Sequence, residues 1–153
     1  MNFSVKFMLP AAAACLLAVA PSVAGPTDSL RTRVTGYRAL GAAFKATNDA
    51  LRSDPVALAN IRQSVTTIRK VSRAQYGWYP AGSGPHPGVK TAAKVEIWSN
   101  ATAFRADQDA FARQADALFR AVNGGDVATI RAEARKLGGT CKACHDTFRQ
   151  SED

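Results

Sequence analysis

The most constraining feature of this sequence is a regular pattern of seven apolar side chains near its C-terminal end. Between residues 127 and 148, the apolar positions follow one another in alternating steps of three and four residues. This spacing places all of them on one face of an α-helix, the face that packs into the core of a helical bundle. The positions are Val127, Ile130, Ala134, Leu137, Cys141, Cys144 and Phe148. The pattern therefore predicts a long helix that Asp126 caps and that carries two cysteines on its core-facing side.

Three earlier segments show apolar stripes with the same helical spacing. The first runs from about residue 28 to residue 51, and its stripe consists of Leu30, Val34, Tyr37, Gly41, Phe44 and Leu51. The second is expected to begin at Asp54-Pro55, as an N-cap followed by a first helical proline, and to end before Gly77. The third is expected to begin at Ser99 or Asn100 and to end at Gly124-Gly125.

The remaining segment, residues 75–89, is rich in proline and glycine and predicts a long loop. No stretch of useful length alternates in the way that a β-strand does. We therefore predict an all-α fold, an antiparallel four-helix bundle with short first and third connections and a long middle one.

Residues 1–24 have the features of an export signal. Lys6 supplies the positive charge, an apolar run follows it, and small residues precede Gly25. The apolar run is too short to cross a bilayer, which takes about 20 residues, so an uncleaved anchor fits less well. This interpretation divides the chain into a signal peptide, residues 1–24, and one domain, residues 25–153. It predicts a periplasmic protein of a Gram-negative bacterium that keeps no membrane attachment after cleavage.

Cysteine, methionine and histidine are scarce in a chain of 153 residues. The sequence holds three cysteines, two methionines and two histidines. Removal of residues 1–24 would leave Cys141, Cys144, His86, His145 and no methionine. A single cysteine pair in an oxidising compartment is expected to form a disulfide or to be bound in another way.

The formal net charge of +8 is spread along all four predicted helices. Because the charge is not gathered into one patch, it argues against nucleic-acid binding. A field of this sign could instead attract acidic redox partner proteins.

The cysteine pair lies in the sequence Cys141-Lys142-Ala143-Cys144-His145, which is the C-x-x-C-H attachment motif of c-type haem. Two thiols three residues apart on a helix share a face and can reach both vinyl groups of one porphyrin. The imidazole of His145 is then available to the iron. The alternatives are a structural disulfide, a redox-active dithiol, which expects a helix N-terminus, and half of a zinc site, which needs two further ligands. Covalently attached haem c is the favoured interpretation.

The sixth ligand of the iron separates two hypotheses. An electron-carrying cytochrome c usually has methionine or histidine at that position. Without a methionine, the one remaining histidine is His86, which lies between Pro85 and Pro87 in the long loop. The first hypothesis is five-coordinate iron that binds small gases. The second is a six-coordinate, low-spin electron-transfer cytochrome with His86 as the distal ligand.

A larger set of residues points to one family. The set consists of Arg33, Gly36-Tyr37, Phe44, Glu96-Ile97-Trp98-Ser99, and the haem motif followed by Asp146, Phe148 and Arg149. Together these residues resemble cytochrome c′, the class II c-type cytochromes. The haem motif alone is not specific to that family, whereas its C-terminal position combined with the first-helix and Trp98 patterns is. The resemblance covers essentially all of residues 25–153, and implies one haem c in a four-helix bundle.

The resemblance also implies roles for residues on the last helix. Cys141 and Cys144 would carry the thioether bonds, and His145 would be the metal ligand. Arg149, one turn later, would lie beside the proximal face of the haem. On pattern alone, Arg149 could equally be a charge that stabilises the helix C-terminus.

On the first helix, the resemblance implies that Tyr37 stands over the vacant sixth position of the iron. It also implies that Arg33 pairs with a haem propionate, a contact that suits the fork of a guanidinium group. Without the resemblance, Tyr37 would be read as an ordinary core residue and Arg33 as a solvated helix charge.

These observations predict a periplasmic haem protein with five-coordinate iron that binds NO and CO. Nitric oxide scavenging or buffering is the expected role, and electron transfer is an additional one. An enzymatic role is not expected, because peroxidase chemistry requires a distal acid–base group and the first helix offers only Tyr37. The family is commonly homodimeric through its first two helices, and Gly41, Ala42 and Ala43 would permit close helix contact.

Overall fold

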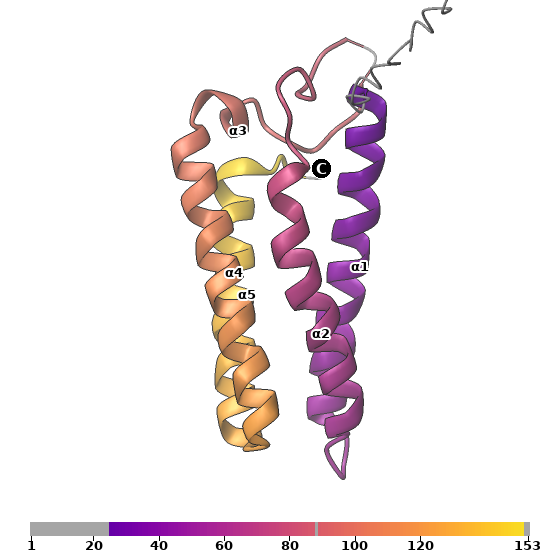
Figure 1. The fold of residues 1–153 in the computed structure, drawn as a ribbon, viewed down its shortest axis with the longest axis vertical. Coiled ribbons are helices and arrows are strands. Elements are labelled where there is room, and N and C mark those ends of the chain that lie inside the picture. The colour runs from indigo at the N-terminus through magenta and orange to yellow at the C-terminus, as the bar shows by residue number, and fades with distance from the viewer. Residues whose placement is uncertain (1–24, 88, 152–153) are drawn as a thin grey trace, which may run out of the picture.

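The structure, a computed structural model, describes residues 25–87 and 89–151. The predicted signal peptide, residues 1–24, lies outside the described residues. Four long helices dominate the fold (Figure 1). The elements are α1 Pro26–Arg52, α2 Leu58–Ala74, the short 3-10 helix η1 Gln75–Gly77, α3 Glu96–Ser99, α4 Ala101–Gly124 and α5 Val127–Phe148. Within the described residues, the only β-type pairing is an isolated bridge between Ala93 and Arg149. The predicted all-α four-helix bundle is confirmed.

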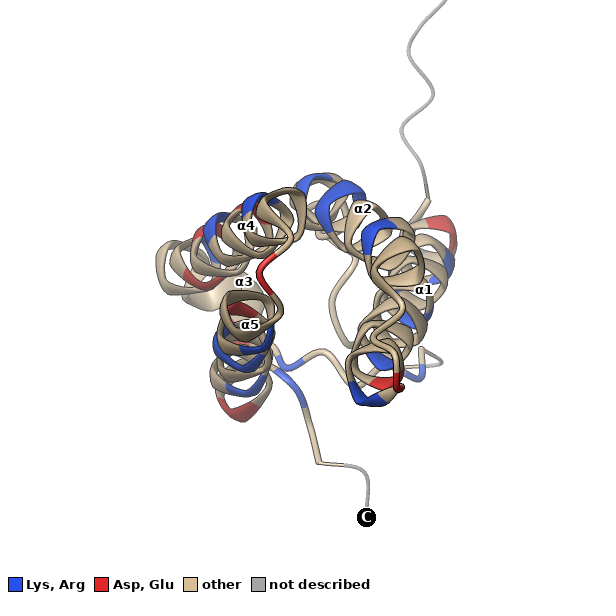
Figure 2. Cartoon of the chain, turned by 90° about the horizontal axis from the view of Figure 1, so that it is seen from below, with Lys and Arg blue, Asp and Glu red and all other residues tan. Residues whose placement is uncertain are grey.

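Neighbouring long helices run antiparallel and pack in the order α1, α2, α4, α5. Helix α2 packs extensively against both α1 and α4, and α4 packs against α5, whereas α1 and α5 make few contacts with each other. The view along the bundle shows α1 and α5 standing apart (Figure 2). The bundle is therefore held mainly by three of its four helix pairs. In the part of the chain that is described, no helix is long and apolar enough to cross a membrane.

The main core combines the apolar stripes that the sequence predicts for the last three long helices with Ala43, Ala50 and Leu51 of α1. Helix α2 contributes Ile61, Val65 and Ile68; α4 contributes Phe111, Ala115, Leu118 and Val122; α5 contributes Ile130, Ala134 and Leu137. A second, smaller cluster of Ile97, Phe104 and Phe148 closes the end of the bundle at which α5 finishes. Burial of these side chains supplies most of the force that holds the helices together.

The predicted stripe of the first helix is partly wrong. Val34 is 40% exposed and Gly41 is also exposed, whereas Arg33, Ala43 and Thr47 face inward. The inward polar groups are satisfied, at least in part, by local or loop partners. The Thr47 hydroxyl donates to the Ala43 carbonyl at 2.9 Å, and one Arg33 nitrogen donates to the long loop. Because these hydrogen bonds reduce the cost of burying polar groups, the buried face of α1 does not follow apolar spacing alone.

The predicted start of the second helix at Asp54-Pro55 is also wrong. The peptide bond between Asp54 and Pro55 is cis, and α2 begins only at Leu58. The Ser53 hydroxyl organises the turn instead. It lies 2.8 Å from the Ala50 carbonyl and accepts a hydrogen bond from the Ala57 amide at 3.2 Å. The residues around Pro55 are thus used to reverse the chain before the helix begins.

The ends of the last two helices agree with the sequence. Helix α4 is preceded by Asn100 and followed by Gly125, whose φ of +78° lies in the left-handed region that favours glycine. Asp126 caps α5, because its carboxylate accepts a hydrogen bond from the Thr129 amide at 2.9 Å. The residues Glu96–Ser99 form a separate short helix, α3, before α4.

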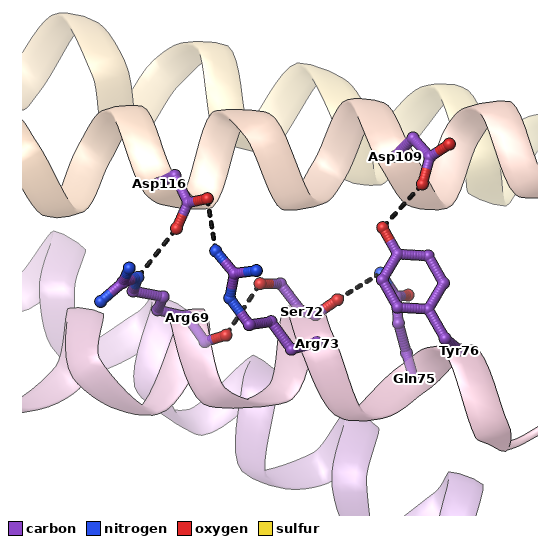
Figure 3. A network of polar contacts seen from close by, with 7 residues as sticks. All are labelled: Arg69, Ser72, Arg73, Gln75, Tyr76, Asp109 and Asp116. Carbon is purple, nitrogen blue, oxygen red and sulfur yellow. Dashed lines mark hydrogen bonds and ion pairs between the residues drawn. The ribbon is translucent and has the colours of Figure 1, made fainter.

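Helices α2 and α4 are also joined by polar contacts on their outer side (Figure 3). Asp116 on α4 lies 2.8 Å from Nε of Arg69 and 2.6 Å from Nη2 of Arg73, both on α2. One end of the same interface is held by Tyr76, whose hydroxyl donates to Asp109 at 2.7 Å. These contacts fix the lengthwise position of α2 relative to α4.

The segment between η1 and α3 lies over the end of the bundle at which α5 finishes (Figure 1). Trp98 donates its indole N–H to the Pro80 carbonyl at 3.1 Å. Farther along, the Lys94 amide donates to Phe148 at 3.0 Å and the Gln150 amide donates to Ala92 at 2.8 Å. The predicted loop therefore begins with a helical turn, and the residues that follow it are pinned to the C-terminus of α5.

Candidate functional site

Cys141 and Cys144 lie one turn apart on α5, and both side chains are half-buried. Cys141 packs against the main core and Cys144 packs against the smaller cluster. Both thiols are free. His145 follows directly and is exposed. The predicted helical placement of the C-x-x-C-H residues is confirmed, because the two thiols share the inward side of one helix end.

The surroundings of the thiols favour the protonated form. Burial raises the pKa of Cys141, and burial together with Asp107 and Cys141 raises the pKa of Cys144 to about 11. A redox-active dithiol requires the opposite, a pKa lowered by a helix N-terminus or a nearby cation. The pair also lies near the C-terminal end of α5 and far from its N-terminus, so its position as well as its surroundings argues against the dithiol alternative.

Tyr37 on α1 faces the same end of the bundle. Its ring meets Trp78 edge to face, with centroids 5.0 Å apart and planes at 88°. Its hydroxyl lies 3.3 Å from the Tyr79 hydroxyl. Burial raises the pKa of Tyr37 far above its ordinary value, and the nearby Tyr79 and Cys144 add to the increase. The phenol is thus held protonated, at the end of the bundle where Cys144 also acts on it electrostatically.

Arg33, one turn before Tyr37 on α1, is only 3% exposed. Its Nη2 donates to the Ser83 carbonyl at 2.7 Å, and its guanidinium lies over the Tyr79 ring at 4.8 Å. The other two nitrogens, Nε and Nη1, are buried without an acceptor among the described residues. Burial lowers the pKa of Arg33, opposed by Tyr79 and Tyr37. The interpretation of Arg33 as a solvated helix charge is therefore wrong.

His145 and Arg149 line a shallow hollow at the C-terminal end of α5, together with Lys94, Asp146, Gln150 and Ser151. Burial and Arg149 lower the pKa of His145, opposed by Asp146. A neutral imidazole is the form that binds a metal. The pairing of Ala93 with Arg149 and the hydrogen bond from Lys94 Nζ to the Asp146 carbonyl, 3.2 Å long, hold this end of the helix in place.

His86 is exposed in the long loop, where its Nδ1 lies 3.0 Å from the carbonyl of the adjacent Pro87. This contact is local and ties His86 to no other element. Among the described residues, no group of three or more His, Cys, Asp or Glu side chains is arranged to hold a metal ion.

Four residues near the site do not emerge from the sequence pattern: Gln75, Trp78, Tyr79 and Ser83. All of them lie in the segment predicted only as a loop. The adjacent aromatic residues Trp78 and Tyr79 could have indicated that this segment packs against a helix. Two large aromatic side chains in a segment rich in proline and glycine need a partner to bury them. Their partners, Gly36, Tyr37 and Arg33, are about 40 residues away in the sequence.

The residues present fit haem c. The two thiols and the imidazole of α5 are the groups that c-type attachment requires. Opposite them, the buried donors of Arg33 need an anionic acceptor, and a propionate carboxylate matches the guanidinium fork. The scarcity of contacts between α1 and α5 also agrees with a flat group held between these two helices.

Comparisons with known proteins agree with this chemistry. The family model for cytochrome c′ matches residues 28–149. A cytochrome c′ of Pararhodospirillum photometricum is 32% identical over 128 residues, which span 83% of this chain and 100% of that protein. The solved structure of cytochrome c′ from Rubrivivax gelatinosus has a TM-score of 0.75 and 28% identity, over 82% of this chain and 97% of that chain. The nitric oxide complex of a variant of cytochrome c prime from Alcaligenes xylosoxidans has a TM-score of 0.76 and 27% identity, over 85% and 100% of the two chains.

Proposed function

This chain belongs to the cytochrome c′ family, and on that premise we propose that it is a periplasmic haem protein with five-coordinate iron that binds NO and CO. Proteins of this family carry one covalently attached haem c. When bound, the haem supplies an iron at which a diatomic gas can be held. Cys141 and Cys144 would form its thioether bonds, His145 would be its protein ligand, and Arg33 would hold a propionate.

The observation that carries the proposal is the position of Tyr37. Its side chain lies on α1 at the end of the bundle where Cys144 of α5 acts on it electrostatically, and a protonated phenol is a poor ligand for iron. Trp78 packs against the ring, and Tyr79 and Gln75 are hydrogen-bonded to the hydroxyl. A side chain held in this way crowds the distal side without ligating the iron. Only ligands that bind strongly enough to overcome this crowding can enter.

Two solved structures support the choice of ligands. Variants of cytochrome c prime from Alcaligenes xylosoxidans hold nitric oxide in one case and carbon monoxide in another, and each is 27% identical to this chain. Arg149 beside His145 offers a positive group on the proximal face, where a second mode of NO binding would displace His145. NO scavenging or buffering is the proposed role, without enzymatic turnover, and electron transfer with an acidic partner is a secondary one.

We also propose a homodimer formed through α1 and α2. The exposed Val34, Gly41 and Ala42 form an outer strip on α1 that a second copy could cover, and the exposed Arg38 and Lys45 lie on the same side of the helix. Ala43, which the sequence also suggests for this contact, faces the core instead and takes no part in it.

The test is the absorption spectrum of the mature holoprotein, ferric and ferrous, with and without CO and NO. We expect high-spin spectra that shift when either gas is added, and the same spectra from the His86→Ala variant. A low-spin ferrous spectrum that is indifferent to CO would contradict the proposal. If His86→Ala then abolished the low-spin spectrum, the protein would be a six-coordinate electron carrier with His86 as its distal ligand.

A further inference from the structure

The buried amide of Gln75 has only one possible orientation. Gln75 lies at the junction of α2 and η1 and is 4% exposed. Its Nε2 lies 3.2 Å from the Ser72 carbonyl, as Figure 3 shows, and 3.4 Å from the Gln108 carbonyl. Both carbonyls can only accept hydrogen bonds, so both N–H groups of the amide donate to them. The amide oxygen therefore points to the remaining partner, the Tyr37 hydroxyl.

This orientation decides which way the Tyr37 proton points. Oε1 of Gln75 lies 3.4 Å from the Tyr37 hydroxyl and can only accept, so Tyr37 donates its single proton to Gln75. The Tyr79 hydroxyl, 3.3 Å away on the other side, then donates to the Tyr37 oxygen. The result is a directed relay from Tyr79 through Tyr37 to Gln75, and two backbone carbonyls set its direction.

Neighbouring side chains limit movement within the relay, in which Gln75 is buried and the two tyrosines are half-buried. Trp78 is buried and packs edge to face against the Tyr37 ring, which limits rotation of that ring. On the far side of Gln75, the Gln108 amide donates to the Gln75 carbonyl at 3.3 Å and ties the residue to α4. A buried hydrogen-bond network with all its donors used holds a single arrangement.

We propose that Gln75 is a specificity-determining positioning residue, which withholds the Tyr37 proton from a ligand bound in the distal pocket. This inference rests on the proposed gas-binding function and deepens it. The donors of a distal pocket decide which diatomic ligands a haem retains. With Tyr37 committed to Gln75, the pocket offers no hydrogen bond to a bound ligand. It therefore favours carbon monoxide and nitric oxide over dioxygen, which depends more strongly on a donated hydrogen bond.

Infrared spectroscopy of the ferrous carbon monoxide complex tests the proposal. A hydrogen bond donated to the bound ligand stabilises negative charge on its outer atom and lowers the C–O stretching frequency. Tyr37→Phe removes a proton that the ligand never receives, so we expect an unchanged frequency. Gln75→Leu frees the Tyr37 proton to turn toward the ligand, so we expect a lower-frequency band. The double variant should return to the wild-type frequency.

Gln108→Leu is the matched control. It removes a hydrogen bond from the same buried cluster and leaves Tyr37 and Gln75 paired, so the frequency should not move. Gln75→Met has a similar side-chain volume and replaces Gln75→Leu if that variant fails to fold. A shift in Tyr37→Phe, or none in the Gln75 variants, would overturn the inference and leave the proposed function standing. The absence of any carbon monoxide band in the wild-type protein would instead reject the proposed function, and this inference with it.

Discussion

Gly36 shows how a single small residue shapes the surroundings of Tyr37. A Cβ atom added at this position would lie 2.5 Å from Cζ2 of Trp78, and closer still to Cη2. Real side chains do not approach one another so closely, so only glycine leaves room for the indole ring. Trp78 in turn packs against Tyr37, the next residue along α1. The absence of one methyl group therefore permits the contact that holds the Tyr37 ring.

We expect Gly36→Ala to lower the free energy of unfolding by about 1–3 kcal/mol, because overpacking forces the buried Trp78 ring out of place. Urea unfolding of the holoprotein measures this. Gly124→Ala is the matched control, because an added Cβ meets open space there and helix propensity is gained. Equal stability of Gly36→Ala and wild type would mean that Trp78 does not depend on the space beside Gly36.

At the scale of elements, α2 and α4 are positioned by both apolar and ionic contacts. Contact between their apolar stripes supplies most of the free energy that holds the two helices together. Apolar contacts alone, however, tolerate some sliding of one helix along the other. Asp116 opposes that sliding, because it pairs with two arginines one turn apart on α2. This matters for the site, since Gln75 follows the end of α2 and its side chain hydrogen-bonds to a carbonyl of α4.

The Asp116 pairs predict a stability that depends on pH. The hydrogen bond from Arg69, followed by that from Arg73, lowers the pKa of Asp116, opposed by partial burial. A carboxylate whose pKa is lowered in the folded state stabilises the fold above its unfolded-state pKa, and that contribution is lost as the pH falls through the folded-state value. Asp116→Asn should therefore lower the free energy of unfolding by about 1 kcal/mol or less at neutral pH, because both arginines are largely exposed. At a pH low enough to protonate Asp116 in the folded protein, the substitution should have no effect on stability.

Urea unfolding of wild type and Asp116→Asn across the acidic pH range checks this expectation. A double-mutant cycle with Arg69→Gln isolates the direct pair from general effects of charge. A difference between the two proteins that stayed constant down to the lowest pH would show that the carboxylate does not stabilise the fold through its charge.

At the scale of the whole molecule, the bundle is asymmetric in its packing. The pairs α1–α2, α2–α4 and α4–α5 are well packed, whereas the pair α1–α5 is not. The groups expected to hold the haem are divided between these two helices: Arg33 and Tyr37 on α1, and the C-x-x-C-H residues on α5. A haem bound to both would supply the contacts that the two helices lack with each other.

We therefore expect the haem-free chain, obtained as the Cys141→Ser, Cys144→Ser variant, to be markedly less stable than the holoprotein. If a haem propionate pairs with Arg33 as proposed, its loss leaves the buried guanidinium without an anionic partner, which costs on the order of 3 kcal/mol. Hydrogen exchange should quicken first in α1 and α5, while α2 and α4 keep their protection and serve as the internal control. Uniform loss of protection in all four helices would argue against a haem that bridges α1 and α5.

The proposed dimer gives a second prediction for the whole molecule. Val34→Asp places a charge in the exposed strip on α1 and should shift the protein from dimer to monomer in analytical ultracentrifugation. Val95→Asp is the matched control, because Val95 is another large apolar side chain that is 60% exposed but lies outside α1 and α2. Dissociation by both variants, or by neither, would contradict an interface centred on α1.

The features that the sequence by itself determined arise from interactions between residues close together in the chain. Apolar spacing predicts the three well-patterned helices, and Gly125 and Asp126 mark the end of α4 and the start of α5. The spacing of Cys141, Cys144 and His145 follows from the geometry of one helix turn. Each of these features depends on residues that are close neighbours in the chain. For that reason the fold class and the attachment residues could be predicted before the structure was considered.

Only the tertiary structure decided which face of α1 is buried and which side chains surround Tyr37. Arg33 is buried because Ser83, 50 residues later, accepts its hydrogen bond, and Gln75 is oriented by a carbonyl 33 residues away. No periodicity encodes such pairings, because they depend on how far one helix slides along another and on where a loop returns. The same polar side chain is solvated or buried according to whether that distant partner arrives, and this is why the sequence alone did not determine it.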